Sequence, residues 1–239
     1  MNDREKNRVV ETLEMIPDRV QSVLELGCGD GRILNRMPAR WTRVGLDADQ
    51  VRVSQVEAPR LVGNIASIPV RDEQFDLVLA AEILEHLDEL TFHPALIEME
   101  RVTRRFIMIT VPFEESLAAN YRKCSRCSCI YHAWGHSRRF TTRDLRGLFR
   151  RAVLVERRFF SPREAKIPSL VYFAVIKVGR VWGASGVDES EACPLCGGPP
   201  NRDQGNLLGK LLIRAVWRMQ KHLPLRKPIW VACLYRKET

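Results

Sequence analysis

The sequence predicts an α/β protein whose mostly parallel sheet is covered by helices on both faces. Three observations carry this prediction: strand-like and helix-like segments alternate through the first half, an apolar run leads straight into a glycine-rich loop, and short strands end in acids. With 239 residues, the chain can bury one substantial core and a small appendage.

Hydrophobic periodicity places the elements along the chain. "NRVVETLEMI" (7–16) has the pattern of a helix and is stopped by Pro17. The predicted strands are "SVLELG", "RVGLDAD" (43–49), "RLVGN", the start of "FDLVLAAEIL" (75–84), "RFIMITVPF" (105–113), "VLVERRFF" and "PIWVACLY". Two further helices are expected, one opening at "GRILNRM" and one over "LTFHPALIEMERV".

Charge is divided unevenly between the two halves. Residues 1–113 hold 14 Lys and Arg against 19 Asp and Glu, whereas residues 114–239 hold 24 against 10, so the net charge of +9 lies downstream. Such a surface attracts nucleic acid, anionic lipid or phosphorylated substrates, although an ordinary solvated basic surface explains it equally well. No apolar run reaches the ~20 residues of a membrane span, and the N-terminus has no signal-peptide core, so a cytoplasmic protein is expected.

The glycine loop indicates a nucleoside ligand. Gly27, Gly29 and Gly31 follow a predicted strand, but Arg32 stands where a dinucleotide fingerprint has its third glycine, and no Gly-Lys-Ser/Thr of a P-loop follows. Asp47 ends the next strand, 20 residues after Gly27. A carboxylate at that position suits a ribose diol because it can accept hydrogen bonds from both hydroxyls.

Four ordered segments carry a resemblance to a known family. "ELGCGDG", "VGLDAD", "GNIASIPVRDEQFDLV" and "AAEILEHL", spread over about residues 20–115, resemble class I S-adenosylmethionine-dependent methyltransferases of the type 11 kind. The resemblance implies a Rossmann-like, seven-stranded sheet, with residues 1–115 as the cofactor-binding core. It implies that residues 116–239 complete the sheet and carry Cys-rich cap insertions and a basic amphipathic helix.

The same resemblance implies a cofactor site. Glu25 and the glycine loop would surround the methionine part of S-adenosylmethionine, Asp47 would hold the ribose, and Asn64, in place of the commoner aspartate, would meet the adenine with Ile65. The implied set is Glu25, Gly27, Cys28, Gly29, Gly31, Asp47, Ala48, Asn64, Ile65 and Glu82. Cys28 is interpreted as a small residue that permits close approach, not as a nucleophile.

"EILEHL" supplies candidates for proton transfer. A hydroxyl acceptor must lose a proton, and Glu82 and His86 are the catalytic candidates at the end of their strand. Glu82, Glu85 and His86 also resemble the divalent-metal site of ubiquinone-pathway O-methyltransferases and of small-RNA 2′-O-methyltransferases. The alternative is a motif without metal, in which Glu85 lies on a solvated helix face.

Two C-x-x-C pairs predict a structural zinc site. Cys124 and Cys127 in "CSRC", with Cys193 and Cys196 in "CPLCGG", provide four thiolates. In the implied fold, one pair follows the strand 105–113 and the other lies between "VLVERRFF" and "PIWVACLY", so one zinc would staple both insertions into a cap over the acceptor. Unliganded thiols or a redox pair are the alternatives.

"CSRCSCIYHAWGHSRRF" resembles a recurrent insert of bacterial methyltransferases, in which a Cys-x-x-Cys pair precedes His and a Gly-His-x-Arg-x-Phe segment. This resemblance implies that His136 and Arg138 face the acceptor. Cys129, His132 and His136 remain second-choice metal ligands. Cys233, inside an apolar strand, is expected in the core.

The segment 207–222 has the pattern of a basic amphipathic helix. Leu211, Leu212, Ala215, Val216 and Met219 recur at helical spacing, and the other face carries Lys210, Arg214, Arg218 and Lys221. Such a helix either packs on its own sheet or lies on an anionic membrane, where it would make the protein peripheral to the inner membrane face.

These observations predict an S-adenosylmethionine-dependent methyltransferase that acts on a hydroxyl of a small or lipid-linked, anionic acceptor. Two alternatives remain: an RNA methyltransferase, and a non-catalytic zinc-containing binding module with the same fold. The chain shows no RNA-binding motif with interleaved aromatics, which makes a nucleic-acid partner the weaker hypothesis.

Overall fold

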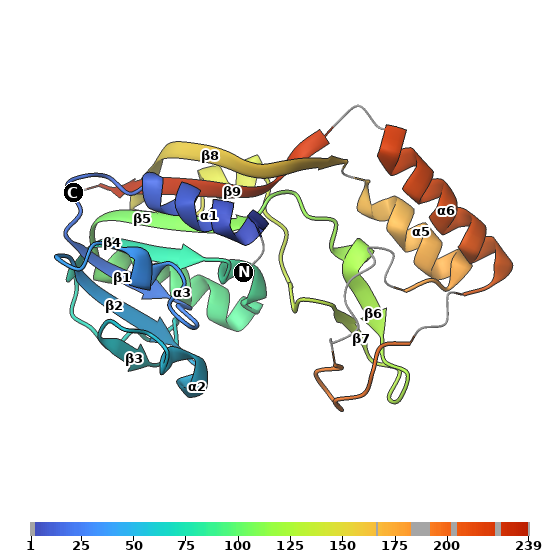
Figure 1. Cartoon of the computed structure of the whole chain (residues 1–239), viewed down its shortest axis with the longest axis horizontal. Helices are drawn as coiled ribbons and strands as arrows, with labels where there is room; N and C mark the ends of the chain where they lie inside the picture. Colours follow the sequence, from blue (N-terminus) through green and yellow to red (C-terminus); the bar gives the residue numbers. More distant parts are fainter. Residues whose placement is uncertain (1–2, 166, 183–191, 202–204, 223–225, 239) are drawn as a thin grey trace. The chain divides into compact units, whose positions relative to one another are not determined.

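The computed structural model describes residues 3–165, 167–182, 192–201, 205–222 and 226–238. The chain divides into two compact units (Figure 1): unit 1 comprises residues 1–113, 140–162 and 228–239, and unit 2 comprises residues 114–139 and 163–227. The sequence places one boundary near position 115, but residues 140–162 and 228–239 also belong to unit 1. They do so because the last two strands of the chain, β8 and β9, join its sheet.

Unit 1 is built on the predicted seven-stranded sheet. Its strand order is β3-β2-β1-β4-β5-β9-β8. The strands are β1 (Ser22–Leu26), β2 (Thr42–Asp47), β3 (Arg60–Val62), β4 (Phe75–Ala81), β5 (Thr103–Pro112), β8 (Ala152–Ala165) and β9 (Arg226–Lys237). β3, β2, β1, β4 and β5 pair in parallel, and β9 runs antiparallel to β5. The Rossmann-like α/β fold expected from the sequence is therefore confirmed.

Apolar side chains project from both faces of this sheet and form a core on each side. In β4, Leu77 and Leu79 point to one core, while Val78 and Ala80 point to the other, as the two-residue period of a strand requires. The helices of unit 1 are α1 (Asp3–Glu14), α2 (Gln50–Val53), α3 (Glu89–Val102) and α4 (Thr142–Arg146). Residues of α1 and α2 join the first core and residues of α3 and α4 the second, so helices cover both faces.

One expected helix is much shorter than the sequence indicates. "GRILNRM" forms only a 3-10 turn, η1 (Leu34–Arg36). Pro38 explains the early stop, because the residue before a proline is driven out of the helical region. Met37 accordingly adopts φ −70° and ψ 153°, an extended conformation. The corresponding turn after β4 is also short, η2 (Leu84–His86).

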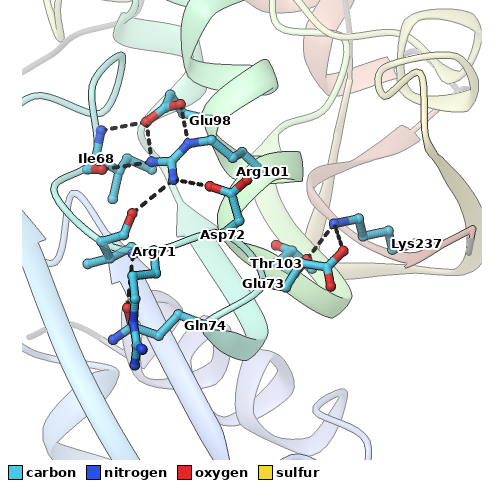
Figure 2. A network of polar contacts seen from close by, with 10 residues as sticks. Ile68, Arg71, Asp72, Glu73, Gln74, Glu98, Arg101, Thr103 and Lys237 are labelled. Carbon is cyan, nitrogen blue, oxygen red and sulfur yellow. Dashed lines mark hydrogen bonds and ion pairs between the residues drawn. The ribbon is translucent and has the colours of Figure 1, made fainter.

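Arg101, near the end of α3, fastens that helix to the connection between β3 and β4 (Figure 2). Its guanidinium donates to both carboxylate oxygens of Glu98, at 2.6 and 2.8 Å, and to Asp72 at 2.7 Å. It also donates to the carbonyls of Val70 and Ile68, both at 2.8 Å. The hydrogen bonds that Arg101 donates to Glu98 and Asp72 raise its pKa, as expected for a cation held by two carboxylates.

The described residues of unit 2 include two hairpins, one of strands and one of helices. An antiparallel pair is formed by β6 (Tyr121–Lys123) and β7 (Ile130–His132). The helices α5 (Ser169–Gly179) and α6 (Leu207–His222) contact each other, and η3 (Leu117–Asn120) contacts α5. A Cβ at Gly179 would lie 2.5 Å from the Cα of Gly209, so glycine is required where these helices meet. Among the described residues, no helix is both long enough and apolar enough to cross a bilayer.

Candidate functional site

The glycine loop leaves β1 in a conformation that only glycine adopts without strain. Gly27 and Gly29 have φ angles of 63° and 54°, and a Cβ at Gly27 would lie 2.9 Å from the side chain of Ile83. The Gly29 amide donates to Asp47 Oδ2 at 2.7 Å, which ties the loop to the end of β2. The loop and the acid predicted from the sequence therefore meet at the carboxyl ends of adjacent parallel strands, where open α/β sheets bind ligands.

Asp47 and the turn after β3 line the same rim. Asp47 Oδ1 also accepts from the Asp49 amide at 2.8 Å, and Ala48 is exposed. Ile65 is buried, whereas Asn64 is exposed and its Oδ1 accepts from the Ala66 amide at 2.8 Å. The Oδ1 atom of Asn64 is therefore already engaged, and an adenine ring that contacts this side chain would meet the donor Nδ2.

Glu25, the fourth residue of β1, is a buried carboxyl with an incomplete set of partners. Only 3% of the residue is exposed, and its Oε2 has no hydrogen-bond partner among the described residues. Burial is the largest influence on this group and raises its pKa to about 8. A buried polar oxygen of this kind calls for a ligand that donates to it, and a cationic donor would lower its pKa.

These features fit S-adenosylmethionine on the chemistry of the groups present. Glu25 offers an acceptor for a cationic amino group, the loop lets the backbone approach closely, and Asp47 has lone pairs left for a ribose diol. Cys28 is buried with its thiol against Gly45, and burial raises its pKa to about 12. This agrees with its interpretation as a small packing residue.

The end of β4 places Glu82 in an unusual backbone conformation. Its φ is 55°, a region that a glutamate rarely adopts, and its Oε1 accepts from Thr110 Oγ1 at 3.1 Å. Arg8 of α1 approaches the same carboxylate at 4.0 Å. Glu85 is fully buried, whereas the next residue, His86, is exposed. Among the described residues, the clusters of metal-ligand side chains include no group of Glu82 with Glu85 and His86.

Unit 2 brings the four predicted zinc ligands together. Sγ of Cys124 lies 3.5 Å from that of Cys196, and Sγ of Cys127 lies 3.6 Å from that of Cys193. All four sulfur atoms lie within 4.8 Å of one another. Tetrahedral zinc with Zn–S bonds of ~2.3 Å requires sulfur atoms ~3.8 Å apart, so the donor set and its spacing fit this ion.

The backbone around these thiols is preorganised for a metal. The amides of Arg126 and Cys127 donate to Cys124 Sγ at 3.3 and 3.5 Å, and the hydrogen bond from Cys127 is the main cause that lowers the pKa of Cys124 to about 6. In the second pair, the Gly197 amide donates to the Cys193 carbonyl at 2.9 Å, with Gly197 at φ 64°. Both segments therefore turn tightly around a common point.

The second-choice ligands are not members of the four-thiol group, although Cys129 packs beside it. Cys129 is absent from the four-thiol cluster, and His132 and His136 instead approach Glu115. His136 Nδ1 lies 2.5 Å from Glu115 Oε2, and Asn120 Nδ2 donates to Oε1 at 2.9 Å. Cys233 is fully buried in β9, as expected.

The hydrogen bonds of His132 fix its tautomer. Its Nδ1 accepts from the amides of Trp134 and His136 at 3.3 and 3.1 Å, so Nε2 carries the proton and faces Glu115 Oε1 at 3.5 Å. A protonated nitrogen cannot bind a metal, which favours a polar network over a second metal site. Burial works to raise the pKa of Glu115, but His132 and His136 outweigh it and lower the pKa to about 2.

Some of these residues were not predicted. Glu115 and Asn120 were not assigned a role, because "FEESLAAN", although it follows the end of a strand, lacks the spacing of a known motif. The approach of Arg8 to Glu82 was not predicted, because the prediction of α1 rests only on its apolar residues. His136 and Arg138 remain predictions as acceptor contacts: His136 lies in the Glu115 network, and Arg138, two residues on, is half-buried.

The family comparison covers the part of unit 1 that holds the glycine loop. Residues 24–106 match the family of methyltransferase domains. This segment, about a third of the chain, is similar to methyltransferase domains. An S-adenosylmethionine-dependent methyltransferase of Mycolicibacterium smegmatis is 38% identical over 73 residues. The match covers 28% of this chain and 28% of that curated relative, so the chain shares about a quarter of the relative's length.

Solved structures share the fold of this protein over most of the chain. A chain of the complex between the Haloferax volcanii Trm112 methyltransferase activator and a methyltransferase has a TM-score of 0.59, with 16% identity over 99% of this chain and 91% of that one. An S-adenosylmethionine-dependent methyltransferase from Archaeoglobus fulgidus has a TM-score of 0.53, with 15% identity over 98% of this chain and 91% of that one.

The same fold occurs in a protein named for different chemistry. The [4+2]-cyclase SpnF has a TM-score of 0.54, with 16% identity over 99% of this chain and 81% of that one. Identities at this level show the fold alone, so the reaction must be argued from the residues of the site.

Proposed function

We propose that this protein is an S-adenosylmethionine-dependent methyltransferase that methylates a hydroxyl of a small or lipid-linked, anionic acceptor. The observation that carries the proposal is Glu25, a buried carboxyl beside the glycine loop whose Oε2 has no donor among the described residues. A ligand that carries both a ribose and a cationic amino group accounts for Glu25 and Asp47 together, whereas a pyrophosphate accounts for neither acid.

In this proposal, the residues of unit 1 mainly position the cofactor and exclude water from it. Glu25 would accept from the amino group of the cofactor, Asp47 would accept from its ribose hydroxyls, and the Gly27–Gly31 backbone would permit its close approach. Bound S-adenosylmethionine supplies a methyl group already activated for displacement by an acceptor oxygen. The protein therefore needs no strong nucleophile, which agrees with the buried, unreactive thiol of Cys28.

Hydroxyl acceptors additionally require a proton acceptor, and the chain offers two imidazoles for this task. His86 is exposed at the end of β4 in unit 1. His136 in unit 2 donates through Nδ1 to Glu115, which assigns its lone pair to Nε2, the arrangement of a carboxylate-oriented general base. Replacing each histidine by glutamine shows which of them is the base. The substitution that removes the base should lower kcat by about 100-fold with little change in KM.

Four cysteines of unit 2 are proposed to hold one structural zinc. Cys124, Cys127, Cys193 and Cys196 would bind it through their thiolates and join the insertion after β5 to the one between β8 and β9. Elemental analysis of the purified protein should give one zinc per chain, and less than half of that in a Cys193→Ser variant.

Calorimetry with S-adenosylmethionine tests the proposed function. We expect binding that Asp47→Ala weakens by at least tenfold, because two hydroxyls lose their acceptor. Asp49→Ala is the matched control, since that acid caps α2 instead. A non-catalytic binding module predicts no binding by either form. An RNA methyltransferase predicts cofactor binding together with RNA affinity that falls steeply as salt rises.

A further inference from the structure

The helical hairpin of α5 and α6 carries apolar side chains that are exposed in the part of the chain that the structure describes. Buried residues occupy one side of each helix: Tyr172 and Val175 in α5, Ile213 and Val216 in α6. These side chains pack on one another and on Ala118 of η3. Their packing accounts for why the hairpin forms, and apolar side chains on the opposite side of each helix, such as Leu170 and Leu211, remain exposed among the described residues.

The outer side of α5 is apolar as well. Leu170 is 78% exposed, and Phe173 and Val178 are also exposed. A helix that is apolar around its whole circumference is normally buried on all sides or in contact with lipid. Lys177 is the only charged residue of α5, and a lysine can lie among apolar neighbours while its ammonium reaches water.

α6 adds a second apolar stripe at helical spacing. Leu208, Leu211, Ala215 and Met219 lie three or four residues apart and are all exposed. The apolar residues that the sequence places on one face of this helix therefore fall into two groups. Val216 is buried in the hairpin, whereas these four residues are exposed. Trp217, 48% exposed, adds a side chain typical of membrane interfaces.

Charge distinguishes among the possible occupants of this surface. Neither helix contains an aspartate or a glutamate. α6 carries Lys210, Arg214 and Arg218, all exposed, and Lys221, whose side chain lies outside the described set. A nucleic acid matches the charge but not the exposed leucines, and a purely apolar protein partner matches the leucines but not the charge. An anionic lipid surface matches both.

We propose that the α5–α6 hairpin is a peripheral docking surface for membranes rich in anionic lipid. Its exposed leucines and aromatic residues enter the boundary between headgroups and acyl chains, while the arginines and lysines contact phosphate groups. At 1.5 Å per residue, the 11 residues of α5 extend ~16 Å, far less than the ~30 Å hydrocarbon core, so the hairpin lies on the membrane and does not cross it.

Sedimentation with lipid vesicles tests this inference on the full chain. The protein should bind vesicles of phosphatidylcholine mixed with phosphatidylglycerol, and should bind pure phosphatidylcholine much more weakly. Lys210→Gln with Arg214→Gln should weaken binding about fivefold for each charge removed. Leu208→Gln with Leu211→Gln should weaken it at least tenfold although the charge is unchanged. Leu90→Gln, in unit 1 and 86% exposed, should bind like the wild type.

Three results would overturn the inference. One is no vesicle binding by the wild type. Another is vesicle binding that the leucine variant retains in full, which would reduce the interaction to adsorption of a basic protein. The last is a wild-type dimer that the leucine variant converts to monomer while vesicles stay unbound, which would identify a second copy as the occupant. Cofactor binding by the same preparations keeps this outcome separate from that of the proposed methyl transfer.

Discussion

Units 1 and 2 are stabilised by different kinds of interaction. Unit 1 buries apolar side chains on both faces of one sheet, and a hydrogen bond from the Gly29 amide to Asp47 joins two strand ends at its carboxyl edge. The clusters of unit 2 are small, one around the α5–α6 hairpin and one of Cys124, Tyr131 and Cys193, and it relies on four thiols and a buried carboxylate held by two histidines. A small unit with little apolar core commonly requires a metal or a polar network to hold its segments together.

Metal removal should affect the two units most unequally. Chelation, or Cys193→Ser, should expose the segments 121–132 and 193–201 to proteolysis and hydrogen exchange, because structural zinc supplies much of the folding free energy of such sites. The sheet of unit 1 should keep its protection. Cys129→Ser is the control, since its thiol lies outside the cluster. Equal loss of protection in both units would contradict this division.

Arg101→Ala tests unit 1 alone. The guanidinium makes five hydrogen bonds of 2.6–2.8 Å, and its loss leaves Glu98 without its cation, so we expect a decrease of about 3 kcal/mol in the free energy of unfolding. Denaturant unfolding measures this change. Arg71→Ala, at an exposed position, should change stability by less than about 0.5 kcal/mol. A similar loss in both variants would mean that the network contributes nothing specific.

Acid should act on unit 2 through Glu115. Because folding depresses the pKa of this carboxyl from 4.5 to about 2, its stabilising effect is complete above pH 4.5 and is lost as the pH falls through 2. Glu115→Gln should therefore be less stable than the wild type at pH 7, by about 2 kcal/mol, with the difference shrinking below pH 4. A constant difference over this pH range would show that the carboxylate is not selectively stabilised in its charged form.

Cys28→Ala should have the smallest effect. The thiol is buried and stays protonated at neutral pH, so its removal costs about 1 kcal/mol of stability by lost packing against Gly45. Cofactor affinity should remain within about threefold of the wild type. Loss of cofactor binding, or rapid alkylation of Cys28 in the wild type, would show that the thiol takes part in the chemistry.

The two units also differ in how far the sequence predicts them. The strands of unit 1 and the contact between Gly29 and Asp47 follow from local patterns, because alternation and strand ends fix which residues share an edge. The four cysteines could be predicted as a cluster because ligand spacing is itself local. The truncated helix at Leu34–Arg36 was missed because Pro38 overrides the apolar periodicity.

Long-range polar contacts could not be predicted in the same way. Glu115 meets His132 and His136 across 17 and 21 residues, with no periodicity linking them. The inward turn of Val216 depends on where α5 packs, a tertiary contact that the helical pattern of 207–222 does not specify. Motifs therefore predict the contact between the glycine loop and Asp47 in unit 1, but not the polar network of Glu115 in unit 2.

Proton release on cofactor binding tests the central claim most directly. With a pKa of about 8, Glu25 is mostly protonated at pH 7, and a cationic amino group placed beside it lowers that pKa and expels the proton. Titration of S-adenosylmethionine at pH 7 in two buffers of different ionisation enthalpy should reveal release of most of one proton by the wild type. Glu25→Gln should bind more weakly and release none. A wild-type binding enthalpy that is independent of buffer, or no binding, would contradict the account.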